Sequence, residues 1–156
     1  MEVEEKMLNE EFKTKVVTAF IREKENVLSD FRADQKRKLD QASQEDTDNK
    51  HIDSKNDETL SEVDFLNENM DNLEREIVRL KEIPIPSTSK EVGFGSLVLT
   101  DHSLVLVGAA QNNLKVDGVE VAGVSTESPF YNALESKGPG DQAEINGRLH
   151  KIRAVV

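Results

Sequence analysis

A run of apolar residues at alternating intervals of three and four most constrains the fold of this chain. The run comprises Val63, Leu66, Met70, Leu73, Ile77 and Leu80. This is the spacing of a coiled-coil seam, so it predicts a helix that packs its apolar stripe against another helix. A second set upstream also follows helical spacing, with the polar Lys24 interrupting it: Leu8, Phe12, Val16, Phe20, Val27 and Phe31.

The segment between these two stripes, residues 41–59, has no apolar periodicity and is rich in Asp, Asn and Ser. Those residue types favour turns and helix caps, because their side chains hydrogen-bond to nearby backbone. We therefore expect an antiparallel helical hairpin, with helices over about 5–43 and 58–82 and an acidic tip at 43–58. Asp57 or Thr59 would cap the second helix. The alternative is that both helices fold back onto a compact core.

The second helix is expected to end at IPIPSTSKE, because Pro84 and Pro86 disfavour helix in the residues before them. We place a linker at 83–92, between a first domain at 1–82 and a second at 93–156. The second domain has the signals of strands. Asp117–Gly118 and Asn146–Gly147 are strong hairpin turns, and Asp101–His102 separates two apolar runs. Alternation breaks within RLHKIRAVV, which indicates a bulge or a shifted register.

These patterns predict an α+β protein in which a small antiparallel sheet of five or six strands follows the hairpin and carries one short helix. That helix lies in SPFYNALESKGPGD, residues 128–141. Ser128 suits the N-cap and Pro129 the first helical position, while Gly138 suits the left-handed exit. Leu134, with Phe130 or Ala133, would face the sheet. Part of the Phe130–Tyr131 pair would then lie at the rim, where an aromatic side chain can anchor a partner.

Composition excludes several functional classes. Residues 1–82 carry a net charge of −9 and residues 83–156 a net charge of −2, which argues against direct nucleic-acid binding through a broad basic face. There are no cysteines, and no apolar run approaches the roughly 20 residues of a membrane helix. The acidic N-terminus does not resemble a secretory signal, so we expect a soluble, cytoplasmic protein. His51, His102 and His150 lack metal-ligand spacing, which argues against a zinc site.

Residues 93–156 resemble the C-terminal domain of the bacterial Gre transcript-cleavage factors. The residues that carry this resemblance are GSLVLT, the central hairpin, SPFYNALESKGPGD and the final hairpin that ends in RLHKIRAVV. The resemblance implies an FKBP-like fold for this domain. The order of parts agrees as well, because Gre factors carry an antiparallel coiled coil before it. The family's tip motif, an Asp and then a Glu within Asn-Ala-Glu-Tyr, is not present here.

The resemblance implies a monomeric partner of RNA polymerase that is not itself an enzyme. Its C-terminal domain would dock through Ser128, Pro129, Phe130 and Tyr131, and its coiled coil would enter the secondary channel. The acids Asp46, Asp48, Asp53, Asp57 and Glu58 would help the polymerase hold Mg²⁺ for transcript cleavage, or would inhibit transcription as in some relatives. Magnesium prefers such oxygen ligands. The alternative function is a protein-interaction module that uses the coiled coil and has no cleavage activity.

Overall fold

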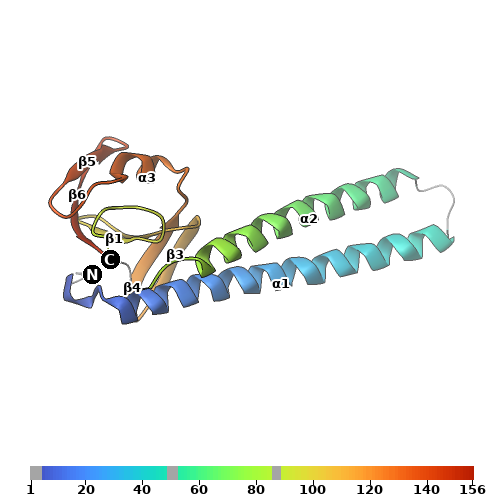
Figure 1. Ribbon diagram of the computed structural model, residues 1–156. Helices are drawn as coiled ribbons and strands as arrows, with labels where there is room; N and C mark the ends of the chain where they lie inside the picture. Colours follow the sequence, from blue (N-terminus) through green and yellow to red (C-terminus); the bar gives the residue numbers. More distant parts are fainter. Residues whose placement is uncertain (1–4, 49–52, 86–88) are drawn as a thin grey trace. The chain divides into compact units, whose positions relative to one another are not determined.

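The computed structural model describes residues 5–48, 53–85 and 89–156, and the side chains of these residues outside 42–59. The elements follow in the order η1 (Glu5–Met7), α1 (Glu10–Asp48), α2 (Asp53–Lys81), β1 (Leu97–Thr100), β2 (Leu104–Val107), β3 (Gln111–Val116), β4 (Val119–Val124), α3 (Pro129–Leu134), β5 (Gln142–Ile145) and β6 (Arg148–Val155) (Figure 1). Two long helices, a six-stranded sheet and one short helix confirm the expected α+β class.

The chain divides into two compact units at places that differ from the expected linker. The hairpin unit is Glu23–Ile77, and the sheet unit combines Met1–Arg22 with Val78–Val156. We expected residues 1–82 to form one domain. The start of α1 joins the sheet instead, because Leu8, Phe12, Val16, Val17 and Phe20 are buried in the same apolar core as the strands.

In the hairpin unit, most of the predicted seam of α2 is buried, and Leu73 is half-buried. Val63, Leu66, Met70 and Ile77 are each less than a tenth exposed. The helices run antiparallel, because Lys24 pairs with Glu76 while Lys38 pairs with Glu62. The stripe on α1 differs from the expectation in two respects. Leu28 is buried and Val27 is only half-buried, and Lys24 continues the buried stripe instead of interrupting it.

Both long helices extend further toward the tip than the sequence predicts, although α1 begins later than expected, at Glu10. We expected α1 to end near residue 43 and α2 to begin at a cap formed by Asp57 or Thr59, but α1 continues to Asp48 and α2 begins at Asp53. Helix propagation adds one hydrogen bond for each residue fixed, so it can outweigh weak individual propensities. Acidic residues early in α2 also oppose the positive end of the helix dipole, which makes an acidic first turn favourable.

The six strands form one sheet in the order β3-β4-β2-β1-β6-β5. Most neighbours are antiparallel, but β2 and β4 are parallel, which corrects the expectation of a wholly antiparallel sheet. The parallel pair arises because β3 lies at the edge, and β4 returns antiparallel to it into the place beside β2. The expected irregularity in the last strand is confirmed as a register shift in its pairing with β1, where Leu99 pairs with Ala154 and Thr100 with Ile152.

The two predicted hairpin turns form as expected. Asp117 and Gly118 have φ of 51° and 78°, and Asn146 and Gly147 have φ of 52° and 77°. Positive φ at both central residues is the requirement of a type I′ turn, which Asn-Gly and Asp-Gly meet at little steric cost.

Each face of the sheet has a helix against it. The start of α1, with Leu80 and Ile83, packs on the face that presents Leu97, Leu99, Leu106 and Val121. On this face Lys13 is 1% exposed, and its Nζ donates to the main-chain oxygen of Val156 at 3.1 Å. The other face presents Val98, Val107, Ile152 and Val155, and α3 covers it with Tyr131 and Leu134. The short helix thus completes a second core, as predicted.

Candidate functional site: the start of α3 and the Asp101–His102 turn

The start of α3 is capped as its sequence predicts. The Oγ of Ser128 accepts a hydrogen bond from the Tyr131 amide at 3.1 Å, and Pro129 occupies the first helical position. Ser128 satisfies one of the donors that a helix start leaves free, and Pro129 contributes no donor of its own. This cap holds the first residues of α3 in a defined position at the surface of the sheet unit.

The exit of α3 differs from the expectation. The helix ends at Leu134, and the left-handed residue after it is Ser136, with φ of 65°, and not Gly138. The reason is a backbone pairing with Val92, which donates to the Lys137 oxygen at 2.8 Å and accepts from the Ser136 amide at 2.9 Å. A left-handed conformation costs a residue with a side chain roughly 1–2 kcal/mol. These two hydrogen bonds offset that cost.

The aromatic pair at the start of α3 divides into one core residue and one surface residue. Tyr131 is 9% exposed and lies in the core with Val98 and Ile152, so it is not a free anchor. Burial is the main cause that raises the pKa of its hydroxyl, followed by the charge of Glu135. Phe130 is half-buried and remains the member of the pair that reaches the rim.

Phe130 belongs to a small aromatic cluster that the sequence did not reveal. Its ring meets the ring of His150 edge-on, with centroids 5.8 Å apart and planes at 85°. His150 in turn meets His102 edge-on, with centroids 5.0 Å apart and planes at 79°. The two histidines are far apart in sequence, and the pairing of β1 with β6 brings the turn beside the last strand. The proximity of the two histidines could have been predicted only if the pairing of β1 with β6 had been known.

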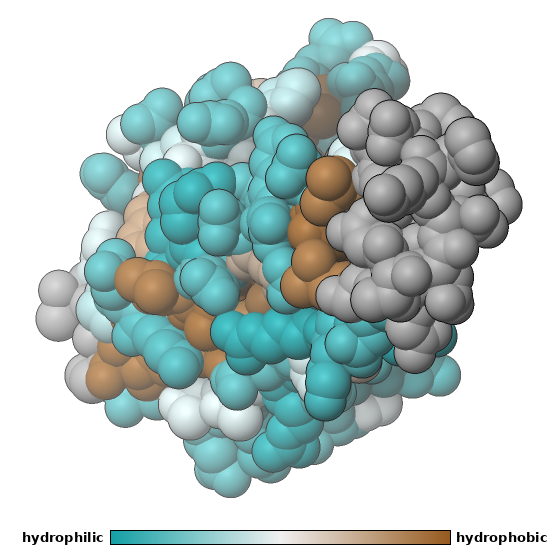
Figure 2. All heavy atoms as spheres, turned by 90° about the vertical axis from the view of Figure 1, so that its right-hand side faces the viewer, coloured by the Kyte–Doolittle hydropathy of each residue, from teal (hydrophilic) through white to brown (hydrophobic). Residues whose placement is uncertain are grey.

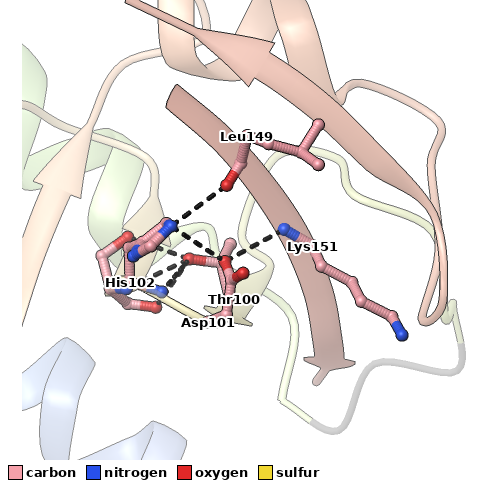
Figure 3. A network of polar contacts seen from close by, with 6 residues as sticks. Thr100, Asp101, His102, Leu149 and Lys151 are labelled. Atoms are coloured by element: carbon pink, nitrogen blue, oxygen red, sulfur yellow. Dashed lines mark hydrogen bonds and ion pairs between the residues drawn. The ribbon is translucent and has the colours of Figure 1, made fainter. Parts of the chain in front are cut away.

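Polar contacts fasten the β1–β2 turn to β6 (Figure 3). The Nε2 of His102 lies 3.1 Å from the Leu149 main-chain oxygen and 3.6 Å from Asp101 Oδ1. The Lys151 amide donates to the same Oδ1 at 3.1 Å. Because a carbonyl oxygen can only accept, the bond to Leu149 requires a proton on Nε2 of His102. Within the turn, the Thr100 Oγ1 accepts from the amides of His102 and Ser103.

Two groups of this site have shifted pKa values. The Lys151 amide is the main cause that holds the pKa of Asp101 below its ordinary value, because it stabilises the carboxylate. Burial is the main cause that lowers the pKa of His150, followed by the nearby His102. The Nδ1 of His150 is buried and has no hydrogen-bond partner among the described residues.

A cleft of about 450 Å³ adjoins the same turn. Its polar lining includes Thr100, Asp101, His102, Asn113, Glu120 and Arg153. Arg153 already pairs with Glu5 at 3.5 Å, and Asp101 with the Lys151 amide. The charged groups of the cleft are therefore in part satisfied within the protein. Among the residues that the structure describes, no three His, Asp or Glu side chains gather as metal ligands.

The predicted tip acids lie at the facing ends of the long helices. Asp46 and Asp48 belong to the last turn of α1, and Asp53, Asp57 and Glu58 to the start of α2. Their side chains are outside the described part of the chain, so their role in metal binding stays a prediction. No helix within the described ranges is long and apolar enough to cross a membrane.

Several large apolar side chains lie on the surface of the described part of the chain. On the face drawn in Figure 2, hydrophobic atoms lie in separate groups among hydrophilic ones. Among the residues whose side chains the structure describes, the exposed large apolar ones are Leu39, Leu60, Phe65, Val78, Phe94 and Leu149. Phe65 is the most exposed, at 65%.

No protein-family model matches the chain, and no curated protein matches it. Among solved structures, the chain is similar to the transcription factor Gfh1, with 18% identity over 86% of this chain and 90% of that one, at a TM-score of 0.35. For GreA factor homolog 1 (Gfh1) of Thermus thermophilus the identity is 16%, the coverage 87% and 94%, and the TM-score 0.34. For Gfh1 of Thermus aquaticus the values are 15%, 94% and 94%, and 0.31. Identity and TM-score are both low, so the function proposed below rests on this chain's own residues.

Proposed function

We propose that this protein is a transcription factor that associates with RNA polymerase and acts through the secondary channel. The observation that carries the proposal is the order of parts. An antiparallel helical hairpin with acids at its tip precedes a six-stranded sheet with a capped short helix. This is the order of the Gre factors that residues 93–156 resemble in sequence.

The sheet unit supplies a defined surface for docking. Ser128 and Pro129 hold the start of α3, and Phe130 lies half-buried at its rim beside His150. A half-buried aromatic on a rigid support suits a partner anchor, because little side-chain freedom is lost on binding. Tyr131 contributes indirectly, by fixing the helix from within the core.

The hairpin unit supplies the acidic tip. Residues 40–58 carry 7 acidic and 2 basic side chains, so the field there is negative. Carboxylates of Asp46, Asp48, Asp53, Asp57 or Glu58 are the hard ligands that Mg²⁺ prefers. In the polymerase centre they would support a metal ion that assists hydrolysis of the transcript, so that the chemistry remains the polymerase's own.

Association is tested first, by a pull-down of purified RNA polymerase core at moderate salt. We expect the full chain to retain the core, and Phe130→Ala to retain less of it. If the full chain does not bind, the proposed function is wrong.

The role of the tip is tested on backtracked elongation complexes. Asp46, Asp48, Asp53 and Asp57 are replaced together by Ala, and transcript cleavage is measured. The matched control replaces four exposed acids elsewhere on the helices, Asp30, Asp64, Glu68 and Asp71, with the same change in charge. We expect the tip variant alone to lose any stimulation or inhibition. An equal loss in both variants would show a general charge effect.

A second candidate is a protein-interaction module that uses the hairpin. The exposed Phe65, on the outer side of α2, favours it. The α2 seam is already buried within the hairpin unit, so a dimer through that seam would have to open it. Light scattering across a range of concentrations separates the candidates. A monomer at all concentrations fits the polymerase factor, whereas a dimer abolished by Phe65→Ser fits the module.

A further inference from the structure

The contact between His150 and its neighbours has an unusual chemical feature. The ring of His150 lies between His102 of the β1–β2 turn and Phe130 of α3, and meets both edge-on. Its Nδ1 is buried without a hydrogen-bond partner among the described residues. A neutral imidazole can leave an acceptor nitrogen unpaired at modest cost, whereas a protonated Nδ1 would bury an unpaired N–H and a charge.

The groups that face His150 do not compensate a positive charge there. The turn presents Asp101 and His102, and the carboxylate of Asp101 is already engaged by the Lys151 amide and lies near His102. The strand of His150 adds the positive Arg148. Of the other two elements against it, α3 presents the uncharged Phe130, and β5 presents Ala143 opposite His150 in the ladder. The charge of Asp101 therefore favours protonation of His150, whereas His102 and Arg148 disfavour it.

We propose that His150 is a pH-responsive contact that holds the β1–β2 turn and the start of α3 together in its neutral form and releases both on protonation. Release loosens the packing of His102 and Phe130 against β6, while the core residues Tyr131 and Leu134 keep α3 on the sheet. The proposal concerns the isolated protein and does not depend on any partner.

The direction of the response follows from proton linkage. Burial lowers the pKa of His150 in the folded protein below its ordinary value near 6.5. The unfolded chain, or a locally opened site, therefore binds the proton more readily than the packed site. Above about pH 6.5 the contact has its full stability. This stability decreases as the pH falls from that value toward the lower pKa that His150 has in the folded protein. Asp101 remains ionised over this range, because its pKa is held below the ordinary value of a carboxyl.

The test is an NMR titration of the full-length protein between about pH 7.5 and about pH 5. It follows the His150 ring, the amides of Asp101–Ser103 and the ring of Phe130. In the wild type we expect the Phe130 ring, and part of the shift of the turn amides, to follow the titration curve of the His150 ring. In His150→Phe, which keeps an aromatic ring and cannot titrate, the Phe130 signals should stay constant and the turn amides should lose that part of their shift. His51→Gln is the matched control and should titrate as the wild type does.

Two results would overturn the proposal. One is a His150 ring that titrates while the turn amides and the Phe130 ring do not move. The other is an unchanged titration of the turn in His150→Phe. If His150→Phe does not fold, His150→Gln serves in its place. The only tyrosine of the chain, Tyr131, reports by fluorescence whether α3 stays on the sheet.

Discussion

The Nζ of Lys24 lies 2.6 Å from Oε2 of Glu76, across the two helices of the hairpin unit. The Lys24 side chain is 6% exposed and that of Glu76 is 35% exposed. A buried ion pair adds little net stability over an apolar pair, but removing one partner of such a pair is costly. The pair therefore favours one alignment of the helices more than it adds to their stability.

Substitutions at this pair should be asymmetric. We expect Glu76→Ala to lower the free energy of unfolding of the hairpin by roughly 1–3 kcal/mol, because the buried Lys24 loses its ion pair with Glu76. Lys24→Met should cost less, because methionine fills the same space without a charge and the Glu76 carboxylate left behind is 35% exposed and can be hydrated. Urea unfolding followed by helical circular dichroism measures both.

A surface pair of the same hairpin serves as the control. Lys38 and Glu62 also approach to 2.6 Å, but Glu62 is 57% exposed. Glu62→Ala should therefore change the unfolding free energy by less than about 1 kcal/mol. If Glu76→Ala and Glu62→Ala change the unfolding free energy equally, the burial of Lys24 does not increase the cost of losing its ion pair.

The approach of α1 to the sheet should depend on Gly123. A Cβ atom built at Gly123 would lie 2.6 Å from Cε2 of Phe20 and would also collide with the main-chain oxygen of Ala109. We expect Gly123→Ala to destabilise the sheet unit by roughly 1–3 kcal/mol or more, since overpacking displaces backbone. Gly93→Ala is the matched control, because a Cβ there meets nothing within 4 Å. Thermal unfolding measures both variants. Equal melting temperatures of Gly123→Ala and Gly93→Ala would contradict a close packing of α1 on Gly123.

Much of the sheet could be predicted from sequence because its turns are chemically distinctive. Asp117–Gly118 and Asn146–Gly147 take the positive φ values that few other residue pairs accept, so these hairpins were correctly placed. The parallel pairing of β2 with β4 could not be predicted, because no local signal tells where an edge strand returns. The left-handed Ser136 was missed for a related reason, since its conformation depends on the distant Val92.

The candidate site was only partly predictable. The cap at Ser128 is local and was correctly predicted, whereas the proximity of His102 to His150 follows from strand pairing. Helical spacing placed part of the Phe130–Tyr131 pair at the rim without deciding which residue, and the structure buries Tyr131 and leaves Phe130 there. Adjacent helical positions point about 100° apart, so a small error in helix rotation exchanges the two roles.

The response of the β1–β2 turn to strong acid should depend on Asp101. Its folded pKa is lowered, mainly by the Lys151 amide, so it contributes stability above the unfolded value near 3.8. That contribution is lost as the pH falls through the folded pKa. We expect Asp101→Asn to lower the melting temperature at neutral pH and to flatten its decline below about pH 4. Parallel melting curves for the wild type and the variant across this range would refute the role of Asp101.

Tyr131 lies in the core and Phe130 at the rim, so we expect substitutions of the two residues to affect different properties. Tyr131→Ala empties a buried site and should destabilise the protein by roughly 3–5 kcal/mol, the range for deletion of a large aromatic side chain from a core. Phe130→Ala removes a half-buried ring and should lower stability less.

If the start of α3 docks on RNA polymerase, however, Phe130→Ala should weaken that binding about tenfold, as for an interface anchor. Tyr131→Phe, which keeps the ring, should leave both properties near the wild type. Melting temperature and polymerase affinity, measured on the same preparations, test the division. A loss of affinity that only tracks the loss of stability across the three variants would remove Phe130 from the docking surface.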